Sequence, residues 1–206
     1  MTMEPVLYPK KVALGAGIVG GIAGGAVMYG MMSTLLTQMG LGANCFAIIM
    51  GLITGQSYEN ALYPGITAHF LTSIAIGVAF GAIINVKKLQ IRGFRKGIGL
   101  GIATGVIAFA VIFVPIAMTI LPPHMMDLMK MMPMKNTAMP EHKTNSAPMD
   151  EKMKADEMNK MVMEQTQKLF PMILAGALVS HIAFGAALGM VVTPIVKRAS
   201  EISSRR

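Results

Sequence analysis

The sequence predicts an all-α membrane protein with four transmembrane helices, arranged as two parallel two-helix repeats. Three observations lead to this fold class. Of 206 residues, 53% are hydrophobic and only 14% are charged, whereas a soluble domain usually carries about 25% charged residues. Long uncharged stretches alternate with short basic segments, and one glycine pattern occurs twice. A short re-entrant or interfacial helix and a methionine-rich external helical loop complete the predicted fold.

The boundaries of the predicted segments follow from the charged residues. Spanning a bilayer takes about 20 apolar residues, and four stretches meet this requirement: 12–36, 66–86, 97–121 and 171–196. Segment 44–55 is apolar but shorter, so we expect it to be re-entrant or interfacial. The predicted organisation is an N-terminus at 1–11, a first repeat at 12–86, a basic loop at 87–96, a second repeat at 97–196 that includes the external loop 122–168, and a basic tail at 197–206.

The basic residues predict the orientation, because loops on the cytoplasmic side are enriched in Lys and Arg. Of the 18 basic residues, eleven fall on one predicted side, so we expect both termini in the cytoplasm and the protein in the cell membrane. These eleven are Lys10, Lys11, Lys87, Lys88, Arg92, Arg95, Lys96, Lys197, Arg198, Arg205 and Arg206. The formal charge of +8 flanks apolar spans and forms no basic domain, which argues against nucleic acid as a partner.

The repeat is visible in the glycines. At an offset of 84 residues, Gly17 and Gly21 fall on Gly101 and Gly105. At an offset of 108 residues, the second helices of the two halves also match, and the pairs are Gly77 with Gly185 and Gly81 with Gly189. The two halves share one orientation, so we expect parallel repeats about an axis along the membrane normal.

Glycines four residues apart lie on one helix face and let two membrane helices approach closely. This predicts a packing role, with a glycine-lined conduit as the alternative. The candidates are Gly17, Gly21, Gly25, Gly77, Gly81, Gly101, Gly105, Gly185 and Gly189. Gly20 and Gly24 repeat the spacing on another face of the first span, and Pro115 should kink the third span.

Two histidines, His69 and His181, lie inside the predicted spans, and Ser73 follows His69 by one turn. A neutral histidine can bridge two helices by a hydrogen bond, or it can take part in metal or proton chemistry. The four spans contain no Asp, Glu, Lys or Arg. This argues against an ion-coupled transporter, which normally needs a carboxylate in its pathway.

The external loop is rich in methionine, and thioether sulfur is a soft ligand that suits Cu(I). The candidate metal ligands are His124, Met125, Met126, Met129, Met131, Met134, His142, Met158, Met161 and Met163. The alternative is that these adaptable apolar side chains form a contact surface. The single cysteine, Cys45, excludes an intrachain disulfide and any paired-cysteine metal motif.

A family resemblance rests on one spacing pattern. The chain carries His69, Ser73, Gly77 and Gly81 at intervals of four, with an echo at His181, Gly185 and Gly189. This resembles small glycine- and methionine-rich polytopic membrane proteins of archaea and bacteria. The methionine loop is similar in style to proteins of copper-dependent archaea such as ammonia oxidisers. That likeness implies an accessory subunit of a copper membrane monooxygenase (ammonia monooxygenase) complex, and it carries over no active-site residue.

No nucleophile–base pair, phosphate loop or cofactor motif is present in a fitting context, so we expect no enzyme activity and no catalytic or cofactor-binding residue. The glycine run 17–25 lies inside a membrane span with no preceding strand. The expected function is a non-catalytic membrane subunit that packs and docks within a larger complex of membrane proteins and lipids. The alternative is Cu(I) acquisition or transport through the loop and the intramembrane histidines.

Overall fold

The computed structural model describes residues 8–120, 124, 151–203 and 205, and the described chain is helical with no strand. Four of its helices are long and apolar enough to cross a membrane: Lys10–Gln38, Leu62–Ile83, Phe94–Thr119 and Gln167–Ser203. The prediction of an all-helical chain with four helices able to span a membrane is confirmed, which is consistent with a multi-pass membrane protein.

The elements in chain order are α1 (Lys10–Gln38), α2 (Cys45–Ile53), η1 (Tyr58–Asn60), α3 (Leu62–Ile83), η2 (Lys87–Leu89), α4 (Phe94–Ala108), η3 (Phe109–Phe113), α5 (Val114–Thr119) and α7 (Glu151–Ser203). The helices run past the predicted apolar limits at most ends, because a helix continues into polar residues without a change of geometry. Helix α3 instead stops before Ile84, where the chain turns into η2.

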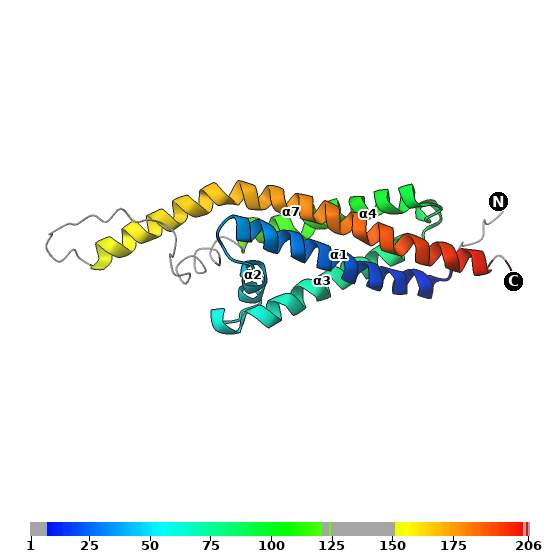
Figure 1. The fold of residues 1–206 in the computed structure, drawn as a ribbon, viewed down its shortest axis with the longest axis horizontal. Coiled ribbons are helices and arrows are strands. Elements are labelled where there is room, and N and C mark those ends of the chain that lie inside the picture. Colours follow the sequence, from blue (N-terminus) through cyan, green and yellow to red (C-terminus); the bar gives the residue numbers. More distant parts are fainter. Residues whose placement is uncertain (1–7, 121–123, 125–150, 204, 206) are drawn as a thin grey trace.

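Helix α1 lies between α3 and α7, and α4 packs on the other side of α7 (Figure 1). Two glycine faces of α1 make this central position possible. Gly17 and Gly21 face α3, while Gly20 and Gly24 face Leu188 and Phe184 of α7. By contrast, α3 and α4 make few contacts with each other.

The spans alternate in direction, so η2 and the C-terminal end of α7 lie at the same end of the bundle as the start of α1, and α2 lies at the other end (Figure 1). At the first of these ends, Tyr8 fastens the chain before α1 to the loop between α3 and α4. Its hydroxyl donates to the carbonyl oxygen of Ile84 at 2.9 Å and accepts from the backbone N–H of Ile91 at 3.1 Å.

The third span is interrupted by one π-helical segment, η3, which ends two residues before Pro115. Proline has no N–H to donate, and its ring clashes with the carbonyl four residues earlier, here that of Val111. A π-type turn is a known way to accommodate such an interruption. The sequence predicted a kink at this proline, and the structure has a change of helix type there.

Helix α2 has nine residues and is not among the four candidate spans. It packs closely on the region where α3 begins. A Cβ on Gly65 would meet the carbonyl oxygen of Ala47, and a Cβ on Gly51 would meet that of Ala61. The prediction that this segment is re-entrant or interfacial stays a prediction.

Helix α7 runs without a break through Pro171 and Pro194. It starts at Glu151, well inside the predicted external loop 122–168, so the second part of that loop is helical. In Figure 1 the yellow part of α7 extends beyond the ends of α1 and α3.

Candidate functional site

All nine predicted packing glycines lie at contacts between helices. A Cβ on Gly17 would meet the carbonyl oxygen of Gly77, and a Cβ on Gly101 would meet that of Gly185. Four further glycines meet a backbone carbonyl oxygen in the same way: Gly21 that of Ser73, Gly81 that of Ala13, Gly105 that of His181, and Gly189 that of Gly97. Gly25 instead meets the side chain of Ser73. None of the nine lines the cavity described next.

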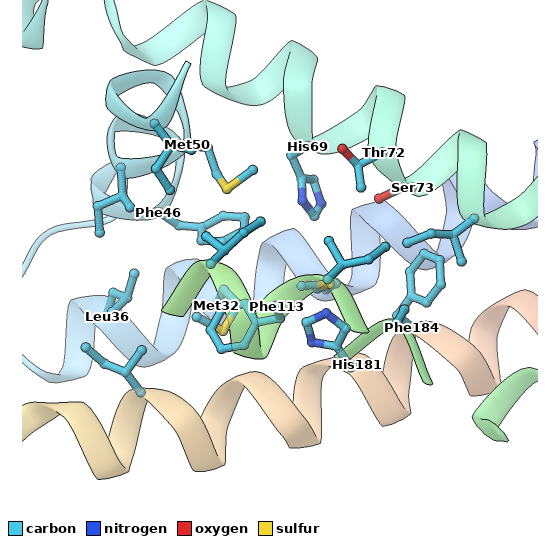
Figure 2. A pocket seen from close by; sticks show the side chains of 18 residues that line it. Met32, Leu36, Phe46, Met50, His69, Thr72, Ser73, Phe113, His181 and Phe184 are labelled. Atoms are coloured by element: carbon cyan, nitrogen blue, oxygen red, sulfur yellow. The ribbon is translucent and has the colours of Figure 1, made fainter. Parts of the chain in front are cut away.

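The bundle contains a cavity of about 120 Å³ (Figure 2). Its walls come from α1, α2, α3, α7 and the part of the third span around η3 and α5. The cavity lies at this place because α3 and α4 make few contacts with each other. The two glycine-packed pairs, α1 with α3 and α4 with α7, meet mainly through α1 and α7. His69 and His181 lie on facing walls of this cavity. Ser73 also lines it, so the three intramembrane polar residues predicted from the sequence are brought together.

His69 connects α3 to α1. Its side chain is only 4% exposed, and its Nε2 lies 2.9 Å from the carbonyl oxygen of Gly25. A carbonyl oxygen can only accept, so Nε2 carries the proton and Nδ1 of the neutral ring keeps a free lone pair. Gly25 makes this contact possible, because a Cβ there would lie 2.8 Å from Oγ of Ser73.

His181 has the same arrangement with the ring nitrogens exchanged. Its side chain is 6% exposed, and Nδ1 lies 2.7 Å from the carbonyl oxygen of Ala177, one turn earlier in α7. Nδ1 therefore donates, and Nε2 keeps the lone pair. This histidine does not bridge helices through its side chain. Neither ring makes a further hydrogen bond to the part of the chain that the structure describes.

Aromatic rings hold both imidazoles in place. The ring of His69 lies 5.1 Å from that of Phe46, edge to face, and 5.4 Å from that of Phe70. The ring of His181 lies 5.5 Å from those of Phe109 and Phe113. These last two rings come from the first and last residues of η3, so the π-helical segment shapes this wall of the cavity.

Apart from the hydroxyl of Thr72, the remaining cavity walls are apolar, and they carry the three thioethers of Met28, Met32 and Met50. None of the described residues that line the cavity has a charged side chain. The sequence analysis did not single out these methionines. The available signal was the four-residue spacing of Met28 and Met32, which places both on one face of α1.

The predicted ligands of the methionine loop are only partly covered by the structure. Met158 and Met161 lie in the helical course of α7, Met163 there is 49% exposed, and His124 is half-buried. Met125, Met126, Met129, Met131, Met134 and His142 lie outside the described residues. Within the described ranges, no three His, Cys, Asp or Glu side chains gather where they could hold a metal ion.

Comparison of the chain with known protein families, with curated proteins and with solved structures finds no match.

Proposed function

We propose that the protein is a non-catalytic membrane subunit, which packs by its glycine-faced helices and docks on partner membrane proteins through the projecting part of α7. The observation that carries this proposal is the length of α7. Its candidate span begins at Gln167, so residues 151–166 precede it. At 1.5 Å per residue, this projecting arm is about 24 Å long.

The side chains of the arm that the structure describes are exposed. Lys160, Met163, Glu164, Gln167 and Lys168 are exposed, and packing against the core begins at Leu169 and Phe170. An isolated helix of this length is marginal in water, because most helix stability comes from tertiary packing. A partner that covers the arm would supply that packing. Mixed charged and methionine side chains suit a polar, adaptable contact.

We further propose that the bundle consists of two parallel repeats. The closest contacts support this, because they obey the sequence offsets of 84 and 108 residues. The pair Gly17–Gly77 corresponds to Gly101–Gly185, and Gly21–Ser73 corresponds to Gly105–His181. In such a repeat, α1 with α3 and α4 with α7 are equivalent pairs.

The arm leaves the bundle on the side opposite the basic loops. Because Lys and Arg are enriched in cytoplasmic loops, this opposite side is the external one. The partner would meet the arm there. The methionine loop is similar in style to proteins of copper-dependent archaea, and this likeness makes a copper membrane monooxygenase (ammonia monooxygenase) complex the first partner to test.

A proline in the arm tests the docking role. Glu164→Pro breaks the arm helix ahead of the span, at a cost of about 3 kcal/mol to the helix, and Glu164→Ala removes the same charge while preserving the helix. We expect tagged Glu164→Ala protein to bring down the same stoichiometric partners as the unaltered chain from its native membranes, and Glu164→Pro protein to lose them. Equal recovery of partners with both variants, or no partner with the unaltered chain, would contradict the proposal.

A further inference from the structure

We propose that the cavity between His69 and His181 binds a soft monovalent cation, Cu(I) or its analogue Ag(I), through His69 Nδ1, His181 Nε2 and thioether sulfur of Met28, Met32 and Met50. This site goes beyond the docking role, which holds whether or not the cavity binds a cation. It is also distinct from the methionine loop, since its methionines lie on α1 and α2.

The hydrogen bonds of the two histidines carry the inference. A metal-bound histidine almost always donates its other ring N–H to a carboxylate, a backbone carbonyl or water, which fixes the tautomer and the ring orientation. Both rings do this, His69 to Gly25 and His181 to Ala177. Each ring therefore has a single unprotonated nitrogen in a side chain that is more than nine-tenths buried.

The remaining donors select the kind of ion. Thioether sulfur is a soft ligand and imidazole a borderline one, and together they suit Cu(I). Figure 2 shows the sulfur of Met50 on the side of His69, and that of Met32 on the side of His181. Hard cations such as Mg²⁺ and Ca²⁺ need oxygen ligands, and none of the described residues that line the cavity has a carboxylate.

The charge balance points in the same direction. All the proposed donors are neutral, so the cation keeps its full charge inside an apolar cavity. An unpaired buried charge is costly, and the cost rises with the charge. A monovalent ion that binds its ligands strongly and is weakly hydrated is therefore favoured over a divalent one such as Zn²⁺.

The test uses the full chain with its loop altered. Four substitutions remove sulfur from the methionine loop and keep the apolar bulk of its side chains: Met126→Leu, Met129→Leu, Met131→Leu and Met134→Leu. We expect this protein, purified in detergent and loaded with Cu(I) under ascorbate, to retain about one Cu(I) per chain against a Cu(I) chelator, as expected for a few soft ligands acting together. Loss of all copper in this background would place the binding in the loop and overturn the inference.

The cavity variants are then made in the same background. His69→Gln keeps an amide donor near the position of Nε2, and His181→Asn keeps one near Nδ1, so both backbone hydrogen bonds can persist while the imidazole lone pairs are lost. We expect the affinity for Cu(I) and Ag(I) to fall about 10–100-fold or more, since even an outer partner of a ligand has that effect. Unchanged affinity would overturn the inference.

A second variant covers the case in which the histidine variants do not fold. This triple variant carries Met28→Leu, Met32→Leu and Met50→Leu. It preserves the apolar volume of the cavity lining and should have a lower affinity for Cu(I). The matched control is Met190→Leu, at a methionine of α7 that is 47% exposed and does not line the cavity. The control should bind like its parent. Equal affinity in the triple variant and the control, or preference for Zn²⁺ over Cu(I) in the parent, would contradict the proposal.

Discussion

His69 of α3 and Gly25 of α1 are joined by a hydrogen bond of 2.9 Å, from Nε2–H to the carbonyl oxygen. This bond exists because Gly25 has no side chain, since a Cβ there would lie 2.9 Å from Cβ of Ser73. Close packing and the placement of the cavity histidine thus have the same cause. The glycines that bring the helices together also determine which polar groups meet inside the bundle.

The glycine contacts predict a sharp contrast between glycines that meet a neighbouring helix and glycines that do not. Gly77→Ala places a Cβ against the carbonyl oxygen of Gly17, where backbone must move, and overpacking of this kind costs about 1–3 kcal/mol. Gly77→Leu and Gly21→Leu should disrupt folding or assembly outright. The control is Gly15→Ala, where a Cβ meets nothing within 4 Å. Thermal unfolding in detergent measures the difference, and equal stability of Gly77→Ala and Gly15→Ala would refute the packing role.

The two hydrogen bonds of the Tyr8 hydroxyl predict that removing this one oxygen atom lowers the free energy of unfolding. Tyr8→Phe leaves the carbonyl of Ile84 and the N–H of Ile91, both in buried residues, without the partner that the hydroxyl supplies. An unsatisfied buried polar group costs about 1–3 kcal/mol. Unfolding measurements should show this loss, whereas Tyr63→Phe, at a side chain that is 78% exposed, should be nearly silent. A silent Tyr8→Phe variant would mean that the N-terminal contact contributes nothing to stability.

Cys45 predicts how the native protein reacts with thiol reagents. Burial raises the pKa of its thiol to about 12, and the thiolate is the reactive form. At pH 8 the thiolate fraction is then roughly one in ten thousand, by the four-unit gap between pKa and pH. We expect no maleimide labelling of the folded protein at pH 8 and full labelling after denaturation in SDS. Reactivity should rise with pH toward 12, and rapid labelling at pH 8 would be inconsistent with a buried Cys45.

Because Cys45 should not react with maleimide in the folded protein, an introduced cysteine can report the orientation of the chain in the membrane. Gln56→Cys introduces an exposed thiol at the end of the bundle that holds α2, and Val86→Cys introduces one at the end that holds η2. If the basic loops are cytoplasmic, an impermeant maleimide added to intact cells should label Gln56→Cys and spare Val86→Cys. Asn136→Cys, in the predicted external loop, should behave like Gln56→Cys. The reverse pattern would invert the proposed topology.

Sequence reasoning predicted the parts of the fold that depend on local pattern. Apolar runs predicted the four candidate spans, and four-residue glycine spacing predicted helix faces that pack, such as those of Gly17 and Gly101. The structure pairs these two glycines with Gly77 and Gly185. The spacing also separated the two faces of α1, although nothing in it says which neighbour each face meets. That choice depends on the relative placement of whole helices.

The cavity could be predicted only in part for the same reason. His69 and His181 stood out because ionisable groups are rare inside membranes, but the methionines beside them did not. Met28 and Met32 are ordinary apolar residues in an apolar helix, and Met50 lies in a segment distant in sequence. Only the fold brings them to one cavity. Tyr8 was missed because its partners are backbone groups, 76 and 83 residues away.

The central claim, that this chain is a subunit of a larger membrane complex, is tested most directly by the native mass of the unaltered protein. The measurement is native mass spectrometry after mild detergent extraction from the membranes in which the protein normally occurs. The account predicts an assembly that contains this chain and at least one different polypeptide in a fixed ratio. Recovery of the chain alone, as a monomer or as copies of itself, under every mild extraction condition would contradict it.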